Sequence, residues 1–151
     1  MSRSGYSYDL DQWDLIRWRG AVASAIRGKR GQALLKELEA ALLVLPEKKL
    51  CKYDFANPDT GEVCALGEVA LKQRLDKGMA LTEALKEIQE KYPEGEEAEV
   101  IAAEMNVADA LVKEITYIND DDYENSTPEK RYEVILAWVR ENIVKPKGKS
   151  E

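Results

Sequence analysis

The stretch from Gln32 to Leu45 reads Gln-Ala-Leu-Leu-Lys-Glu-Leu-Glu-Ala-Ala-Leu-Leu-Val-Leu and decides the fold. Its apolar residues recur with the period of a helix that buries one face. The stripe predicted to be buried consists of Leu34, Leu35, Leu38, Ala41, Leu42 and Leu45. Pro46 cannot continue a helix, so we expect the helix to end just before it. A long amphipathic helix of this kind predicts a helical domain around it.

The same period appears on both sides of this helix. A first helix is expected from Asp11 to Arg27, with Leu15, Trp18, Val22 and Ile26 on its apolar face. Arg27-Gly28-Lys29-Arg30-Gly31 should break the chain, so residues 11–45 are predicted to form an antiparallel helical hairpin. Further helical patterns follow Leu66 and Thr82, and Thr127-Pro128 is a strong start signal for a last helix.

A different pattern lies between residues 49 and 65. Apolar and polar residues alternate from Leu50 to Phe55, and turn formers are dense from Ala56 to Gly61. This pattern predicts a short β-hairpin that must pack on the helices, because an isolated two-stranded ribbon is marginal in water.

These patterns predict a mainly α fold with about six helices. We expect one domain over residues 1–145, followed by a flexible tail at 146–151. The domain is predicted to contain a basic helical hairpin at 11–45, a β-hairpin at 49–65 and an acidic helical part at 66–145.

Charge is unevenly distributed along the chain, whose net charge is −7. Residues 1–53 carry 10 Lys and Arg against 6 Asp and Glu, whereas residues 54–151 carry 12 against 23. A basic N-terminal face could meet phosphates or an acidic protein, and the acidic remainder could meet a basic partner.

The segment from Ala102 to Ile115 has the spacing of a helix-turn-helix. Ala102 and Ala108 are small, Asn106 suits a turn, and Val107, Val112 and Ile115 are apolar. A DNA-reading second helix would present cations, whereas this one offers Asp109, Lys113 and Glu114 outward. The spacing therefore favours two helices packing their own core, while a DNA contact and a protein contact stay open.

The candidate binding residues are five cations around the end of the first helix: Arg17, Arg19, Arg27, Lys29 and Arg30. Cations flanked by glycines can bind anions through charge and backbone amides together. They can equally form a solvated turn, because positive charge is favourable near a helix C-terminus. We keep them as a candidate site for an anion, a nucleic acid or an acidic protein.

Chemistry that depends on histidine is excluded, since the chain contains none. No catalytic constellation is found, so the chain is predicted not to be an enzyme, and no cofactor or metal is expected. Cys51 and Cys64 are expected to be reduced, and Asp120-Asp121-Asp122 with Glu124 to form an exposed acidic loop. No apolar run approaches the length of a membrane span, and no signal peptide is recognised, so a cytoplasmic protein without membrane contact is predicted.

Several segments resemble a family of small, largely uncharacterised proteins encoded by bacteriophages and prophages. The resemblance lies in Ser2–Tyr6, Ile16–Ala21, Ala25–Gln32, Gly61–Gly67 and Thr127–Glu129. It covers most of residues 1–70 and the last quarter of the chain. The chain departs from the family between about Leu75 and Glu97, and it has Asn106 where a helix-turn-helix would prefer Gly. The resemblance carries no catalytic residue or cofactor, but it implies a cytoplasmic location in a host bacterium.

From these observations we expect a non-enzymatic accessory binding protein that contacts a host or phage macromolecule as an inhibitor or adaptor. A protein partner is favoured and nucleic acid stays possible, while the oligomeric state is open. The alternative is a DNA-binding regulator that uses the basic N-terminal hairpin, the 102–115 element, or both.

Overall fold

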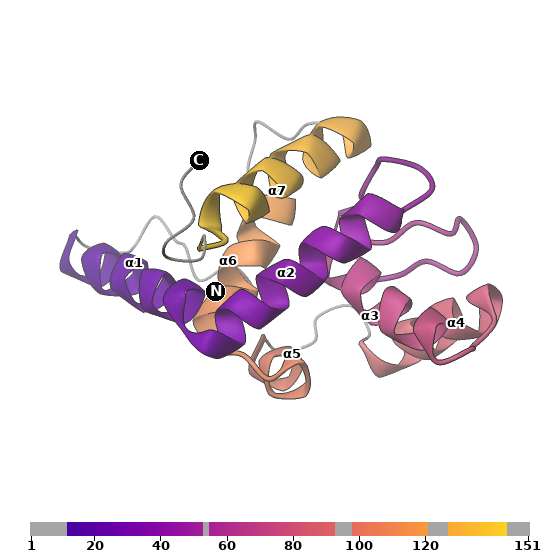
Figure 1. The fold of residues 1–151 in the computed structure, drawn as a ribbon, viewed down its shortest axis with the longest axis horizontal. Helices are drawn as coiled ribbons and strands as arrows, with labels where there is room; N and C mark the ends of the chain where they lie inside the picture. The colour runs from indigo at the N-terminus through magenta and orange to yellow at the C-terminus, as the bar shows by residue number, and fades with distance from the viewer. Residues whose placement is uncertain (1–11, 53–54, 93–97, 121–126, 145–151) are drawn as a thin grey trace.

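Helices make up nearly all of the regular structure. The computed structural model describes residues 12–52, 55–92, 98–120 and 127–144. Within these ranges Figure 1 shows seven helices: α1 (Gln12–Arg27), α2 (Lys29–Val44), α3 (Ala65–Asp76), α4 (Leu81–Lys91), α5 (Ala98–Met105), α6 (Asp109–Asp120) and α7 (Pro128–Asn142). The prediction of a mainly α fold is therefore confirmed.

The described residues contain seven helices where about six were expected. The two helices that the helix-turn-helix spacing predicted are α5 and α6, and a left-handed residue separates them. Asn106 has a φ of 59°. The N–H of Val107 donates to the carbonyl of Ala102 at 3.0 Å, and the N–H of Asn106 donates to the carbonyl of Ala103 at 3.4 Å. These two bonds form a Schellman motif, which satisfies the last carbonyls of a helix and ends it.

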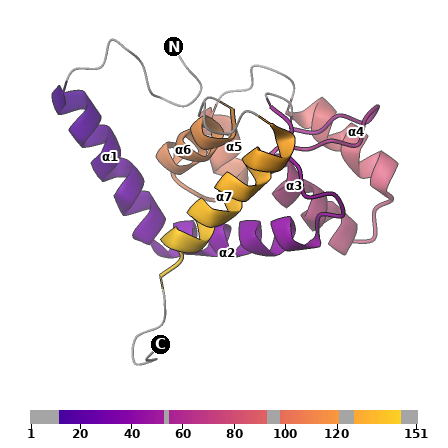
Figure 2. The ribbon, with the colours of Figure 1, turned by 90° about the horizontal axis from the view of Figure 1, so that it is seen from above.

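Two helices, α2 and α6, form the centre of the molecule. The α2 helix contacts α1, α3 and α7, and α6 contacts α1, α3, α5 and α7. Figures 1 and 2 show α1 and α4 at opposite ends of this arrangement. All seven helices contribute to one core, whose fully buried side chains include Leu35, Leu38, Leu42, Ile88, Leu111, Ile115, Ile135 and Val139.

The prediction of a β-hairpin over residues 49–65 is wrong in detail. The described residues of this segment contain a single antiparallel bridge, between Ala56 and Val63, and no strand. Two backbone bonds flank the bridge, from the N–H of Asn57 to the carbonyl of Glu62 at 2.8 Å and from the N–H of Cys64 to the carbonyl of Phe55 at 3.2 Å. The carbonyl of Val63 accepts from the N–H of Cys51 at 2.9 Å. Cys64 is already the N-cap of α3, and its thiol accepts from the N–H of Gly67 at 3.3 Å. A second strand cannot continue because the chain enters a helix one residue after the bridge.

The predicted basic break at residues 27–31 is narrower than expected, since Gly28 alone separates α1 from α2. Lys29 and Arg30 belong to the first turn of α2. A Cβ on Gly31 would lie 1.8 Å from the carbonyl oxygen of Ala25, so this position admits only glycine without movement of the backbone. The close approach at Gly31 lets the two helices meet at the sharp corner seen in Figure 2.

Helix start signals were reliable in one place and wrong in another. Thr127 caps α7, because its hydroxyl oxygen accepts from the N–H of Lys130 at 3.0 Å, and Pro128 follows as the first helical residue. By contrast, α4 begins at Leu81 with Ala80 as its N-cap, so the expected Thr82 lies inside the helix.

Candidate functional site

A groove lies between α1 and α7, and two of the predicted binding residues, Arg19 and Arg27, line it together with residues of α6 and α7. It encloses about 500 Å³. Its lining comes from α1, from α6, and from α7 with the two residues that follow it: Arg19, Val22, Ala23, Ile26, Arg27, Glu114, Trp138, Glu141, Asn142, Ile143 and Val144. We call this surface the α1–α7 groove.

Charge in the α1–α7 groove is divided between its two sides. Both cations that line it, Arg19 and Arg27, come from α1, whereas both carboxylates, Glu114 and Glu141, come from α6 and α7. Neither arginine forms an ion pair with another residue in the described part of the chain. The rest of the lining is mainly apolar. Such a surface suits a segment that is amphipathic and carries both charges.

Gln32 joins the two sides of the groove. Its amide nitrogen donates to the carbonyl of Ile26 at 2.7 Å and to the carbonyl of Asn142 at 3.0 Å. Its amide oxygen accepts from the N–H of Val144 at 2.8 Å. All three partners line the groove, so one side chain at the start of α2 fixes the C-terminal end of α1 relative to the end of α7.

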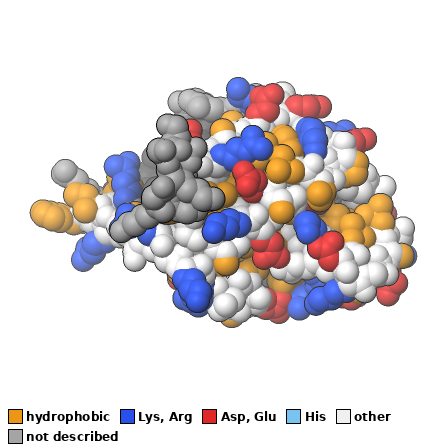
Figure 3. Space-filling view, viewed as in Figure 1, with side chains coloured by type: hydrophobic (Ala, Val, Ile, Leu, Met, Phe, Trp, Pro, Cys, Tyr) orange, Lys and Arg blue, Asp and Glu red, His pale blue; other side chains and the backbone are white. Residues whose placement is uncertain are grey.

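Only part of α1 packs against the rest of the molecule. Val22 and Ile26 are buried, and the Trp18 ring lies 5.8 Å from the ammonium of Lys113 on α6, a cation–π contact. Towards its N-terminus the helix projects from the body (Figure 2), and apolar side chains lie at this end (Figure 3, left). There Trp13 is 71% exposed and Ile16 is 50% exposed.

The five predicted site residues do not form one cluster. Arg19 and Arg27 line the α1–α7 groove. Arg17 is exposed and pairs with Asp14 at 2.6 Å instead, because residues two apart on a helix point to nearly opposite sides. Lys29 and Arg30 are exposed on the first turn of α2, beyond the corner. Arg30 donates to the side-chain oxygen of Asn106 at 3.4 Å.

The segment with helix-turn-helix spacing does form two helices, α5 and α6, but most of the second helix is buried. The helix that would read DNA, α6, contacts four other helices. Seven of its twelve residues are buried: Ala110, Leu111, Val112, Ile115, Ile118, Asn119 and Asp120. Lys113, the cation on this helix, lies within 3.9 Å of Glu99 and 3.7 Å of Asp109. DNA readout needs a helix that can enter the major groove, and α6 presents no such face.

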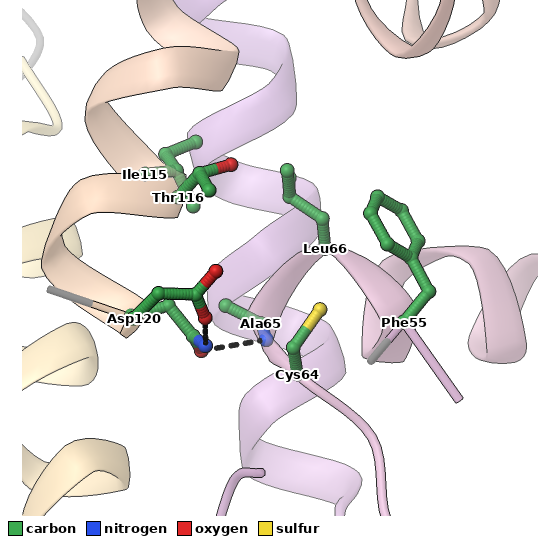
Figure 4. A pocket seen from close by; sticks show the side chains of 8 residues that line it. Phe55, Cys64, Ala65, Leu66, Ile115, Thr116 and Asp120 are labelled. Carbon is green, nitrogen blue, oxygen red and sulfur yellow. Dashed lines mark hydrogen bonds between the residues drawn. The ribbon is translucent and has the colours of Figure 1, made fainter. Parts of the chain in front are cut away.

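A buried polar cluster fixes the start of α3, and Figure 4 shows the part of it around Ala65 and Asp120. The Asn119 side chain accepts from the N–H of Ala65 at 3.1 Å and donates to the carbonyl of Cys51 at 3.0 Å and to Asp120 at 2.6 Å. The sequence predicted that Asp120 begins an exposed loop, which is wrong, because α6 extends through it and the side chain is buried. The other acidic residues of that loop lie outside the described residues.

The cavity beside this cluster is too small to be an active site. It holds about 10 Å³, the room of a single water molecule, and is lined by Cys64, Thr116 and Asp120 among others. Burial raises the pKa of the Cys64 thiol, with a further contribution from nearby Cys51, so the thiol stays protonated. Both cysteines are free. This geometry gives no support to a cysteine nucleophile.

One carboxyl group, that of Glu68 on α3, is buried, and the charged groups that shift its pKa are two lysines. Its side chain is 3% exposed, and its Oε1 atom has no hydrogen-bond partner among the described residues. Burial raises the pKa of Glu68 to about 7, although Lys48 and Lys72 oppose the rise. A buried acid of this kind affects stability rather than forming a catalytic pair.

Two further grooves of similar size carry less chemistry. One, of about 400 Å³, lies between α3, α4 and α5, and four of its five charged side chains are paired, Arg74 with Glu87 at 2.8 Å and Lys91 with Glu104 at 3.0 Å. The other, of about 520 Å³, lies between the turn at 57–62 and the start of α4. It contains none of the predicted site residues.

No group of three or more acidic or cysteine side chains that could hold a metal gathers among the residues that the structure describes. Over the same residues, no helix is long and apolar enough to cross a bilayer.

Sequence reasoning missed the half of the groove that α7 provides. Trp138, Glu141 and Asn142 lie more than a hundred residues from Arg19 in the chain, and nothing local in the sequence pairs the two helices. The one available signal was Gln32, a polar residue at the edge of a buried helical stripe.

Comparison with protein-family models, with curated proteins and with solved structures gives no significant match. The function must therefore be inferred from the α1–α7 groove itself.

Proposed function

We propose that this chain is a non-enzymatic binding module that holds a segment of a protein partner in the α1–α7 groove. The single observation that carries the proposal is the division of charge across this groove, with Arg19 and Arg27 on one side and Glu114 and Glu141 on the other. A protein segment can present carboxylates to α1 and cations to α7 while its apolar residues face Val22 and Trp138.

Nucleic acid is a poorer occupant of the same groove. Its phosphates would meet the α1 arginines, but the opposite side would bring them close to two carboxylates. Phosphate neutralisation dominates the affinity for nucleic acid, so a mixed groove gives little net attraction. The resemblance to phage-encoded proteins leads us to take the partner as a host or phage protein, and inhibition or adaptation as the role.

Capture by photo-crosslinking tests the proposal. A photoreactive residue in place of Ala23, which lines the groove, should capture a partner from phage-infected host lysate with or without nuclease. The same residue in place of Thr82, exposed on the remote α4, should not.

Charge reversal then assigns the capture to the groove. Arg19→Glu should reduce it at least about tenfold, since a rim charge is reversed against its complement. Lys86→Glu makes the same change in charge on the exposed face of α4 and should leave capture unchanged. Equal capture by Arg19→Glu and Lys86→Glu would overturn the proposal. So would catalytic turnover by the wild-type chain that Arg19→Glu abolishes.

The alternative, a DNA-binding regulator, is favoured by one observation. Arg27, Lys29 and Arg30 are all exposed at the corner between α1 and α2. Binding of duplex DNA through this corner should weaken steeply with salt and fall in Arg27→Ala and Arg30→Ala. Fluorescence anisotropy with labelled duplex DNA at two salt concentrations measures this binding. If DNA binds at the corner, Arg30→Ala should lower the affinity for DNA more than Arg19→Glu does.

A further inference from the structure

The projecting helix α1 turns a stripe of residues away from the body, and the first two, Trp13 and Ile16, are large, apolar and exposed. Helical periodicity aligns one stripe along it: Trp13, Ile16, Gly20, Ala23, Ser24 and Arg27. Leu15, Trp18 and Val22 lie on the opposite side of the helix, towards the body. Trp13 and Ile16 begin the stripe and are largely exposed.

Gly20 lies in the middle of this stripe and has no role in the folded chain. A Cβ built at this position meets nothing within 4 Å. Glycine in a helix interior costs about 1 kcal/mol relative to alanine. Gly31 on α2 differs, because the carbonyl oxygen of Ala25 leaves no room there for a Cβ. Gly20 instead leaves room for a second backbone to approach α1 from outside.

The stripe on one copy of α1 fits the same stripe on a second copy that runs antiparallel to it. Trp13 and Arg27 are each seven residues from Gly20, in opposite directions. In two antiparallel copies of α1 that cross at Gly20, the large Trp13 and Ile16 of one copy face the second half of the other, where Ala23 and Ser24 are small. Trp13 then meets the guanidinium of Arg27, a favourable cation–π pair.

We propose that α1 pairs with α1 of a second copy of this chain, antiparallel and centred on Gly20, to form a two-fold symmetric dimer. The interface is isologous, so each contact occurs twice. Two helices of 16 residues form a small interface, so the dimer is reversible and depends on concentration. The proposal does not rest on the proposed function, since it needs neither the α7 side of the groove nor Arg19. Ala23 and Arg27 also line the α1–α7 groove, so a dimer and a bound partner segment would compete for these two residues.

Sedimentation equilibrium of the full chain tests this pairing. The wild-type chain should be a dimer at high micromolar concentration. Gly20→Leu should raise the dissociation constant about tenfold or more, because it places a side chain where the two backbones meet. The substitution has open space in the single chain and favours the helix, so loss of folding does not confound it. Ala21→Leu adds a similar side chain on the same helix outside the stripe and should leave the dimer intact.

Disulfide trapping tests the antiparallel orientation. A chain with Trp13→Cys mixed with a chain with Arg27→Cys should form a mixed disulfide under mild oxidation. Neither variant alone should crosslink beyond the background of the wild-type chain, whose two cysteines are partly or fully buried. A chain with Gly20→Cys should crosslink to itself.

Three results would overturn the inference. They are a wild-type chain that stays monomeric at millimolar concentration, a dimer that tolerates Gly20→Leu as well as Ala21→Leu, and a Trp13→Cys chain that crosslinks to itself in place of the mixed pair. Arg19→Glu distinguishes this outcome from failure of the groove, since it should reduce partner capture at least about tenfold and leave the dimer unchanged.

Discussion

Gln32 and Asn142 are 110 residues apart in the chain, yet the side-chain amide of Gln32 donates to the backbone carbonyl of Asn142 at 3.0 Å. The same amide also bonds Ile26 and Val144. One side chain therefore satisfies three backbone groups from two segments, at the corner where α1, α2 and the end of α7 meet.

Gln32→Ala should lower the free energy of unfolding by about 1–3 kcal/mol, because it leaves half-buried backbone groups without their partners. Urea denaturation followed by circular dichroism measures the change. Gln89→Ala on the exposed face of α4 is the matched control and should stay within about 0.5 kcal/mol of wild type. Equal midpoints for the two variants would show that water replaces the Gln32 bonds without cost.

Gly67→Ala and Gly20→Ala make the same chemical change and should have opposite effects. A Cβ at Gly67 would lie 1.7 Å from the carbonyl oxygen of Phe55, so the backbone must move. We expect a loss of about 3 kcal/mol or more, a size typical of severe backbone or packing conflict. Gly20→Ala, in open space, should gain about 1 kcal/mol. Thermal unfolding of both variants checks the pair, and a stable Gly67→Ala protein would contradict the close approach.

Glu68 makes stability depend on pH. Burial raises its pKa from 4.5 to about 7 in the folded chain. Between these values the folded state binds more protons than the unfolded state, so the free energy of unfolding falls as pH rises, by roughly 3 kcal/mol at most. Glu68→Gln should remove this fall and be more stable than wild type at about pH 8.

Urea denaturation at about pH 5 and about pH 8 measures the effect of Glu68. Glu83→Gln, exposed in the first turn of α4, is the control and should keep the wild-type dependence. A wild-type chain equally stable at both values, or a Glu68→Gln chain that keeps the full decrease, would mean that Glu68 is hydrated in solution.

Asn106→Ala should destabilise the chain by about 1–2 kcal/mol, because alanine tolerates the left-handed conformation less well than asparagine. Asn106→Gly has no such penalty and serves as the control, although it also loses the contact with Arg30. The difference between the two variants in urea isolates the backbone effect. If alanine and glycine were equivalent, α5 and α6 would have to join differently in solution.

The helices were predictable because their signals are local. The stripe from Leu34 to Leu45 repeats within one element, and Thr127-Pro128 start α7 through a hydroxyl and a ring that act within one turn. The predicted hairpin shrinks to one bridge because the chain turns into α3 directly after it, with Cys64 as the N-cap. Alternation of apolar and polar residues does not show where this change occurs, because strand formation depends on its tertiary context.

The candidate site was predictable only on one side. Arg19 and Arg27 could be named because cations gather visibly in α1, but the companion residues on α7 depend on long-range packing. Arg17 was grouped with them by sequence proximity, whereas the helix turns it away towards Asp14. A run of three acids is typical of an exposed loop, yet Asp120 is buried and its carboxylate accepts from the side chain of Asn119.

The position of α7 has a consequence for the order in which the surface is assembled during synthesis. One wall of the α1–α7 groove belongs to the first described helix and the other to the last, so α1 leaves the ribosome long before its counterpart exists. Contacts between segments so distant in sequence form late in folding. A chain interrupted before α7 would keep Arg19 and Arg27 but lack the facing wall, so binding in this groove would report on translation through the final helix.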